Sequence, residues 1–120
     1  MRYHKEIGFP ETLIFPDSIL KLIYTDHAIA KGEKINFYAW IHDVRKIKKE
    51  TVIEVVTDND ITIKEVVVRL HYGDEYDVCI AVDIKKNTGI VKTIWLNRKK
   101  DTHQTLDKTI YDIPKTKQLV

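Results

Sequence analysis

Hydrophobic and polar residues alternate through most of the second half of the chain, and this alternation predicts β-strands. Four segments carry the pattern: TVIEVVT at 51–57, ITIKEVVVRLHY at 61–72, DVCIAVDI at 77–84 and IVKTIWLN at 90–97. Each is rich in branched and aromatic residues, and short polar stretches with the composition of turns separate them. Because such short turns join neighbouring antiparallel strands, we expect a four-stranded antiparallel meander.

The first half of the chain has a weaker pattern, which predicts helices. A short strand ends near Tyr24. Thr25 or Asp26 is a suitable N-cap for the helix that follows, and Gly32 is a suitable end. The segment 36–44 (NFYAWIHDV) has apolar residues at helical spacing but also the composition of a strand, and we favour a helix. The expected fold class is α+β, with the meander packed on one or two N-terminal helices.

The length of 120 residues fits one domain with a real core. Prolines punctuate both ends, so we expect an irregular N-terminal arm at 1–16, a single α+β domain at 17–113 and a flexible tail at 114–120. No apolar run approaches the ~20 residues of a membrane span. With one cysteine, Cys79, no internal disulfide can form, so we expect a cytoplasmic protein without membrane association.

Alternation also assigns the two faces of the expected sheet. Simple hairpins place Tyr72 opposite Tyr76. They also place Ile84 opposite Ile90, and a slip of one residue would exchange the faces. One face is then almost wholly apolar and faces the helices: Val66, Val68, Leu70, Val78, Ile80, Val82, Ile84, Ile90, Ile94 and Leu96. Lys92 is the misfit on this face, and we expect its ammonium to reach solvent or a partner.

The opposite face is mixed. It carries three cross-strand rows: His71, Asp77 and Asn97, then Arg69, Cys79 and Trp95, then Val67, Ala81 and Thr93. Small side chains on the middle strand predict a shallow depression, floored by Cys79 and Ala81 and rimmed by polar groups. An antiparallel sheet normally has one solvated face, so the pattern fits either an ordinary surface or a site.

The stretch KTIWLNRKKDTHQTLD at 92–107 allows two interpretations. Trp95, Asn97, Asp101 and His103 fall close together at the exit of a strand. Asp101 or the threonine after it is a good N-cap for a final short helix. Alternatively, the stretch forms one wall of an active site and folds back over the rim of the depression. The two interpretations are compatible.

Charge and motifs exclude several kinds of site. The net charge of +2 is too small to indicate nucleic acid by itself, although RKIKK at 45–49 and RKK at 98–100 are basic clusters. These clusters are either solvated loops or a discontinuous rim that holds a phosphate backbone. The chain has no HExxH motif or cysteine–histidine cluster for a metal, no glycine-rich phosphate loop and no GxSxG elbow.

Several short motifs match the pattern of a known group of proteins. They are His27-Ala28 at the first helix, Arg69 in a strand, VKTIWLN at 91–97, DTH at 101–103, TLD at 105–107 and Tyr111. In this order they resemble the small toxin-like ribonuclease superfamily, which groups barnase, the colicin tRNases and the RelE and ParE toxins, and within it an uncharacterised, phage-encoded group. The resemblance covers about residues 20–113 and is densest toward the C-terminal end.

This resemblance implies a fold like that of RelE and barnase, and cleavage or binding of RNA without metal or cofactor. Such cleavage needs a base, an acid and cations around the phosphate. The implied catalytic residues are His27, Arg69, His71 and His103, and the implied substrate-binding residues are Lys31, Thr93, Trp95, Asn97 and Asp101. Lys31 departs from the pattern, because the superfamily usually has an arginine there and a lysine lacks the bidentate fork.

Three functional classes remain open at this point. The first is a ribonuclease-like enzyme that acts on RNA. The second is a catalytically silent module that binds RNA or protein through the same sheet face. The third is a phage structural or interaction protein whose arm, GFPETLIFPD, docks on a partner. The expected partners are therefore RNA or a protein, antitoxin-like, host or virion, in the cytoplasm of the host cell if the protein is phage-encoded. The sequence does not determine the oligomeric state.

Overall fold

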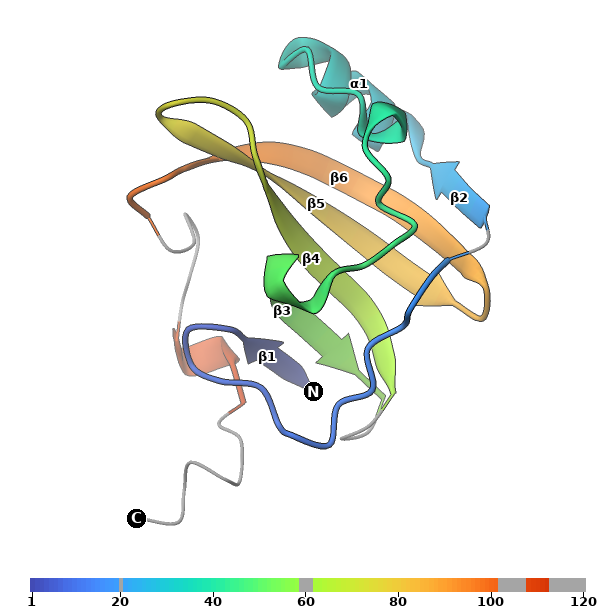
Figure 1. Cartoon of the computed structure of the whole chain (residues 1–120), viewed down its shortest axis with the longest axis vertical. Helices are drawn as coiled ribbons and strands as arrows, with labels where there is room; N and C mark the ends of the chain where they lie inside the picture. The colour runs from blue at the N-terminus through green and yellow to red at the C-terminus, as the bar shows by residue number, and fades with distance from the viewer. Residues whose placement is uncertain (20, 59–61, 102–107, 113–120) are drawn as a thin grey trace.

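One twisted sheet forms the centre of the molecule (Figure 1). The computed structural model describes residues 1–19, 21–58, 62–101 and 108–112. The elements are β1 (Arg2–His4), β2 (Lys21–Tyr24), α1 (Asp26–Lys34), β3 (Val52–Thr57), β4 (Ile63–His71), β5 (Tyr76–Lys85) and β6 (Thr88–Arg98), with 3-10 turns η1 (Ala39–Ile41), η2 (Lys49–Thr51) and η3 (Lys108–Ile110). The strand order is β1-β3-β4-β5-β6-β2.

The α+β class is confirmed, but the four-stranded antiparallel meander is wrong, because the sheet has six strands and is mixed. The four expected strands do pair in sequence as β3, β4, β5 and β6. β1 adds an antiparallel strand beside β3, and β2 adds a parallel strand beside β6. β2 confirms the short strand that we expected to end near Tyr24, although its place in the sheet was not expected. β1 has three residues, too few to produce a readable alternation.

The N-terminal half differs from expectation in two places. Residues 2–4 of the expected irregular arm form a strand, while the division into arm, domain and tail stays a prediction and the tail at 114–120 lies outside the described residues. The segment 36–44 contains the 3-10 turn η1 but no α-helix. Asn36 has a φ of 54°, which interrupts helical geometry directly after α1. Trp40 is therefore 56% exposed rather than turned inward.

The predicted hairpin register is confirmed over the first half of the β5–β6 pair and along β4–β5. His71 lies opposite Asp77, and Arg69 lies opposite Cys79. Cys79 in turn lies opposite Trp95, and Ala81 opposite Thr93. The polar face therefore carries the cross-strand rows that the alternation predicted.

A β-bulge changes the register beyond that point, so Ile84 lies opposite Gly89 and the expected pairing of Ile84 with Ile90 is wrong. Ala81 pairs with Thr93 but Val82 pairs with Val91, so Lys92 is an extra residue on β6. Val91 becomes fully buried in the core in place of the expected Ile90. The Lys92 ammonium lies 3.1 Å from Glu65 and 3.2 Å from Asp83. The misfit of Lys92 is thus resolved by a bulge and two ion pairs.

The main core lies between the apolar face of the sheet and the N-terminal half. Ala28 of α1, Phe37 and Val44 pack there against Val68, Ile80 and other sheet residues. Thr25 fixes the start of α1, because its Oγ1 accepts from the Ala28 amide at 3.1 Å and donates to the Lys92 carbonyl at 3.0 Å. None of the described helices is long and apolar enough to span a membrane.

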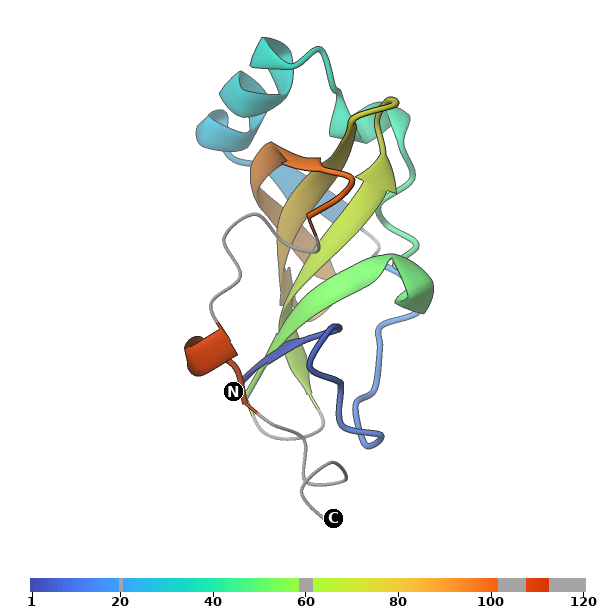
Figure 2. The ribbon, with the colours of Figure 1, turned by 90° about the vertical axis from the view of Figure 1, so that its left-hand side faces the viewer.

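A smaller apolar cluster lies on the opposite face of the sheet. Ile53, Val67, Cys79 and Ala81 are buried there, and Trp95 packs against them. The segment 108–112 with η3 lies on this side, across the sheet from the 36–51 segment (Figure 2). Its Tyr111 hydroxyl donates to the buried carboxylate of Glu54 at 2.5 Å. Both faces of the sheet are thus partly covered.

Candidate functional site

Arg69 is held by the turn that follows β6. Its Nε donates to Asp77 at 2.8 Å, and its terminal nitrogens donate to the carbonyls of Asp101 at 2.8 Å and Arg98 at 2.9 Å. The side chain is 14% exposed. An arginine guanidinium has five N–H donors in a fixed fork, so these bonds commit much of it to protein acceptors. In this state Arg69 orders a turn rather than presenting a free fork to a phosphate.

Asn97 and Lys99 hold the same turn. Asn97 is 1% exposed, and its amide donates to the carbonyls of Arg98 at 3.1 Å and Asp101 at 2.9 Å. The Lys99 ammonium donates to Asp77 at 2.7 Å. Burial alone would raise the pKa of Asp77, but the hydrogen bonds and charges of Lys99 and Arg69 outweigh burial and lower that pKa.

The polar residues at the exit of β6 therefore stabilise the turn that follows this strand. Asp101 takes part through its backbone carbonyl, which accepts from Arg69 and Asn97. His103, which we expected to be catalytic, lies outside the described residues. The predicted final helix at 103–108 falls largely on the same undescribed part of the chain.

His27 and Lys31 lie on the other side of the sheet from Arg69 and Trp95. Both belong to α1, which packs on the apolar face through Ala28. Trp95 belongs to the cluster on the opposite face. His27 is exposed near the helix start. The structure therefore does not bring His27 together with Arg69, Thr93, Trp95 and Asn97.

The predicted depression is present in part on the polar face, because its lining includes Ala81 but not Cys79, the other expected floor residue. It is a hollow of about 290 Å³ whose walls include Val67, Ala81, Thr93 and Trp95, with Arg2, Glu54, Glu65, Lys92, Ile110 and Tyr111 around them. Its cations are paired, Arg2 with Glu54 and Lys92 with Glu65. These ion pairs leave little uncompensated positive charge to attract a phosphate.

Cys79 lies fully buried in the smaller apolar cluster, and burial raises the pKa of its thiol to about 12. A thiol with so high a pKa is protonated at neutral pH, and the thiol form is a poor nucleophile. No group of three or more histidine, cysteine, aspartate or glutamate side chains suited to a metal occurs among the described residues.

A larger hollow lies on the other face, between the segment 41–48 and β4. Its volume is about 720 Å³, and its lining includes His42, Lys46, Lys48, Thr51 and His71. The His42 ring stacks on Phe37 with 4.4 Å between centroids and an interplanar angle of 15°. The Lys99 ammonium lies 3.0 Å from Nδ1 of His71. Since an ammonium can only donate, Nδ1 of His71 is the acceptor in this contact.

An exposed aromatic cluster adjoins this hollow. Trp40 makes an edge contact with Tyr24 at 5.9 Å and a tilted contact with Tyr38 at 5.0 Å between centroids. A second hollow of about 590 Å³ is lined by Lys21, Leu22, Tyr24, Trp40, Ile41, His42, Asp43 and Arg45. Burial raises the pKa of Tyr24 and the nearby Arg45 charge partly opposes that shift. Arg45 therefore lies close to this cluster.

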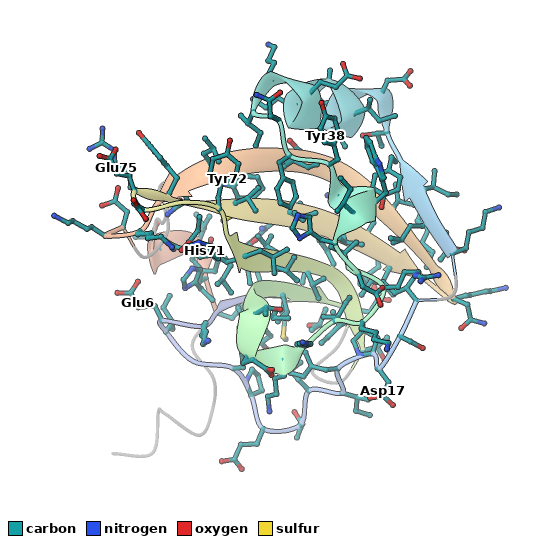
Figure 3. The ribbon with its side chains drawn as sticks, turned by 45° about the horizontal axis from the view of Figure 1, so that its top comes forward. Glu6, Asp17, Tyr38, His71, Tyr72 and Glu75 are labelled. Carbon is teal, nitrogen blue, oxygen red and sulfur yellow. The ribbon has the colours of Figure 1, made fainter. Side chains whose placement is uncertain are left out.

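The two hollows share Ile41, His42 and Asp43, so they adjoin each other at this segment. We call their combined surface the basic groove and define it by Lys21, Tyr24, Trp40, His42, Arg45, Lys46, Lys48 and His71. In Figure 3 the labelled Tyr38 comes from the segment below α1, and His71 and Tyr72 come from the end of β4. Of the predicted site residues that the structure describes, His71 alone belongs to the basic groove.

The sequence interpretation missed His42 and Trp40 as candidate residues. A helix at 36–44 would have placed Trp40 in the core, and His42 had no nearby partner in sequence. The available signal was the direct succession of the aromatic segment NFYAWIHDV and the basic segment RKIKK. Aromatic and basic residues next to each other in a loop are typical of surfaces that bind single-stranded nucleic acid.

No family model, curated protein or solved structure matches this chain. The resemblance to toxin-like ribonucleases, and the fold and activity that it implies, therefore stay predictions.

Proposed function

We propose that this protein is a ribonuclease-like domain that binds single-stranded RNA in the basic groove. The observation that supports this proposal most directly is the position of Trp40. Trp40 is 56% exposed, and its ring contacts those of Tyr24 and Tyr38 near Arg45. An exposed aromatic ring that packs against other rings beside a cation is a suitable platform for an unpaired base, and such stacking contributes ~1–3 kcal/mol per base.

Positive charge extends from this platform along the groove. Lys21, Arg45, Lys46 and Lys48 are exposed there, and Asp43 is the acidic residue among them. Asp43 lies 3.3 Å from Arg45, but both side chains are about half exposed, so the pair holds Arg45 weakly. These cations contrast with those of the polar face, which are engaged by carboxylates. The groove therefore suits a phosphate backbone better than the polar face does.

The same groove offers His42 for metal-independent cleavage, and His71 belongs to the lining of the same hollow although its Nδ1 contacts Lys99; this lining favours cleavage as a second candidate function. In such a reaction one neutral imidazole takes the proton of the 2′-hydroxyl, and the 2′-oxygen forms a bond to phosphorus. The other, protonated imidazole gives its proton to the 5′-oxygen as the P–O5′ bond breaks. The products are a 2′,3′-cyclic phosphate and a free 5′-hydroxyl, and Lys46 or Lys48 would stabilise the charge on the phosphorane.

Tryptophan fluorescence tests binding directly, because the chain has two tryptophans, Trp40 and Trp95. In Trp95→Phe, Trp40 is the remaining indole, and we expect a single-stranded RNA oligomer to quench it saturably at about 50 mM salt. Trp40→Ala should weaken binding about tenfold or more in a filter assay, while Trp95→Phe should bind like the parent protein. Unquenched Trp40 fluorescence, together with equal RNA binding by Trp40→Ala, would refute the proposed site.

Cleavage has its own test. The protein should convert RNA to 2′,3′-cyclic phosphate ends in the presence of EDTA, and His42→Ala and His71→Ala should each lower the rate about 100-fold. His27→Ala is the matched control, because His27 lies on α1 outside the groove, and it should cut at the parental rate. RNA that is bound but uncut would leave the binding proposal in place and exclude the enzymatic one.

A further inference from the structure

The two edges of the sheet differ. At one edge, the C-terminal segment covers β1. The Asp112 amide donates to the Arg2 carbonyl at 2.8 Å, and the Arg2 amide donates to the Asp112 carboxylate at 2.7 Å. At the other edge lies β2, which pairs with β6 alone in the sheet order. The outward backbone amide and carbonyl of Arg2 on β1 are therefore hydrogen-bonded, and the next question is whether the outward backbone groups of β2 are hydrogen-bonded too.

The backbone of β2 presents a regular hydrogen-bonding edge. The Lys21 amide donates to the Asn87 carbonyl at 3.2 Å, and the Thr25 amide donates to the Val91 carbonyl at 3.1 Å. Because successive residues of a strand direct their backbone groups to opposite sides, Leu22 and Tyr24 direct theirs away from β6. Within the described part of the chain, no backbone group outside the sheet bonds to those two residues.

Side chains around this edge define what can occupy it. Ile23 is 43% exposed on β2, and the hollow of about 590 Å³ beside the strand is walled by Leu22, Tyr24 and Trp40. An extended chain that paired with β2 would place alternate side chains against these apolar surfaces. Edge strands of this kind bind added strands unless a proline, a bulge or a covering segment blocks them.

Charge distinguishes among the possible occupants. Lys21 and Arg45 border the edge, and the exposed Lys85 and Lys86 lie at the β5–β6 turn, where Lys21 is aligned with Thr88. A second copy of the chain, which carries a net charge of +2, offers less complementary charge than an acidic segment does. An acidic segment would meet complementary charge along its length. RNA has no peptide amide and carbonyl groups, so it cannot form the backbone hydrogen bonds of an added strand beside β2.

We propose that β2 is a docking edge for an extended segment of a partner protein in which apolar and acidic residues alternate. The segment adds a strand beside β2, with its apolar side chains in the hollow at Trp40 and its carboxylates near Lys21 and Arg45. The proposal concerns peptide binding and does not depend on the proposed RNA site. It implies that a bound segment and RNA compete, because both contact Trp40.

The test uses the full chain and a fluorescent peptide of alternating valine and glutamate that is long enough to span β2. We expect saturable binding by anisotropy at about 50 mM salt, where charge attraction is weakly screened. The matching peptide of alternating valine and lysine should not bind. Lys21→Glu combined with Arg45→Glu should weaken binding about tenfold or more, while Lys64→Glu, whose exposed side chain pairs with Asp58, should not.

Two N-methylated peptides test the backbone pairing. One carries the methyl groups on its valine amides and the other on its glutamate amides, so each lacks the N–H groups of one side of the strand. Only one side of an added strand faces β2, so the two peptides should differ in affinity by about tenfold or more. No saturable binding of the unmodified acidic peptide, or a smaller difference between the methylated peptides, would overturn the proposal. Loss of RNA binding in Trp40→Ala would not affect this outcome.

Discussion

Replacing Arg69 by alanine should destabilise the fold. The guanidinium bonds to one carboxylate and to the carbonyls of Arg98 and Asp101, and the side chain is 14% exposed. Hydrogen bonds to a charged group contribute about 1.5–3 kcal/mol each when a partner is removed from a dry site. Water can reach this turn, so we discount the sum and expect a loss of about 2–4 kcal/mol in the free energy of unfolding.

Urea denaturation of Arg69→Ala and of the parent protein measures this loss, provided that the slope m stays the same. Arg45→Ala is the control, because that side chain is 59% exposed and its weak pair should contribute under ~0.5 kcal/mol. A loss below about 1 kcal/mol for Arg69→Ala would refute the reasoning and return Arg69 to the list of candidate phosphate ligands.

The loss of unfolding free energy in Arg69→Ala should also depend on pH. The folded-state pKa of Asp77 is lowered, so its ion pairs contribute fully above the pKa of an unfolded aspartate, about 3.9. That contribution disappears as the pH falls through the lower folded-state pKa. The difference in stability between the parent protein and Arg69→Ala should therefore shrink in acid, as urea titrations at several pH values will measure. A difference that is constant down to the acid transition would show that Asp77 is not the relevant partner.

Three further predictions concern stability and reactivity. Ile80→Ala should lower the unfolding free energy by ~2–5 kcal/mol in urea, because Ile80 is fully buried in the main core; a loss near zero would contradict its place there. Tyr111→Phe should cost ~1–3 kcal/mol, because it leaves the buried Glu54 carboxylate without its 2.5 Å donor, and an unchanged midpoint would argue that this contact is absent in solution. Cys79, with its thiol pKa raised to about 12 by burial, should react with a thiol reagent slowly when folded and quickly in urea, and rapid native labelling would disprove its burial.

The long hairpins were predictable because their signals are local. Turn residues fixed the pairing of His71 with Asp77 and of Cys79 with Trp95, and the alternation then assigned the faces. The bulge at Lys92 was not predictable in the same way, although a lysine in an apolar strand was the visible sign of it. β1 was missed because a strand so short carries almost no periodic signal, and β2 was expected as a strand but its parallel pairing with β6 was not.

The candidate site was harder to predict than the sheet. The polar row containing Arg69 and Trp95 is present. The alternation could not show that the Arg69 guanidinium donates to the carbonyls of Arg98 and Asp101 in the turn after β6. His42 and His71 line one hollow although they are distant in sequence, and only the tertiary fold brings them together. The left-handed backbone at Asn36 decides whether Trp40 faces the core or solvent, and helical spacing gives no indication of such a break.

The bulge at Lys92 also determines where this gene segment tolerates a change in length. Residues 88–91 and 93–98 each alternate correctly between the two faces, and Lys92 is the supernumerary position that joins the two halves. Deleting that codon would leave Val91 and Ile94 in the core and Trp95 on the other face. Deleting any codon nearer the end of β6 would invert the following side chains. Single-codon deletions in natural or laboratory variants should therefore survive at the bulge and be eliminated along the rest of the strand.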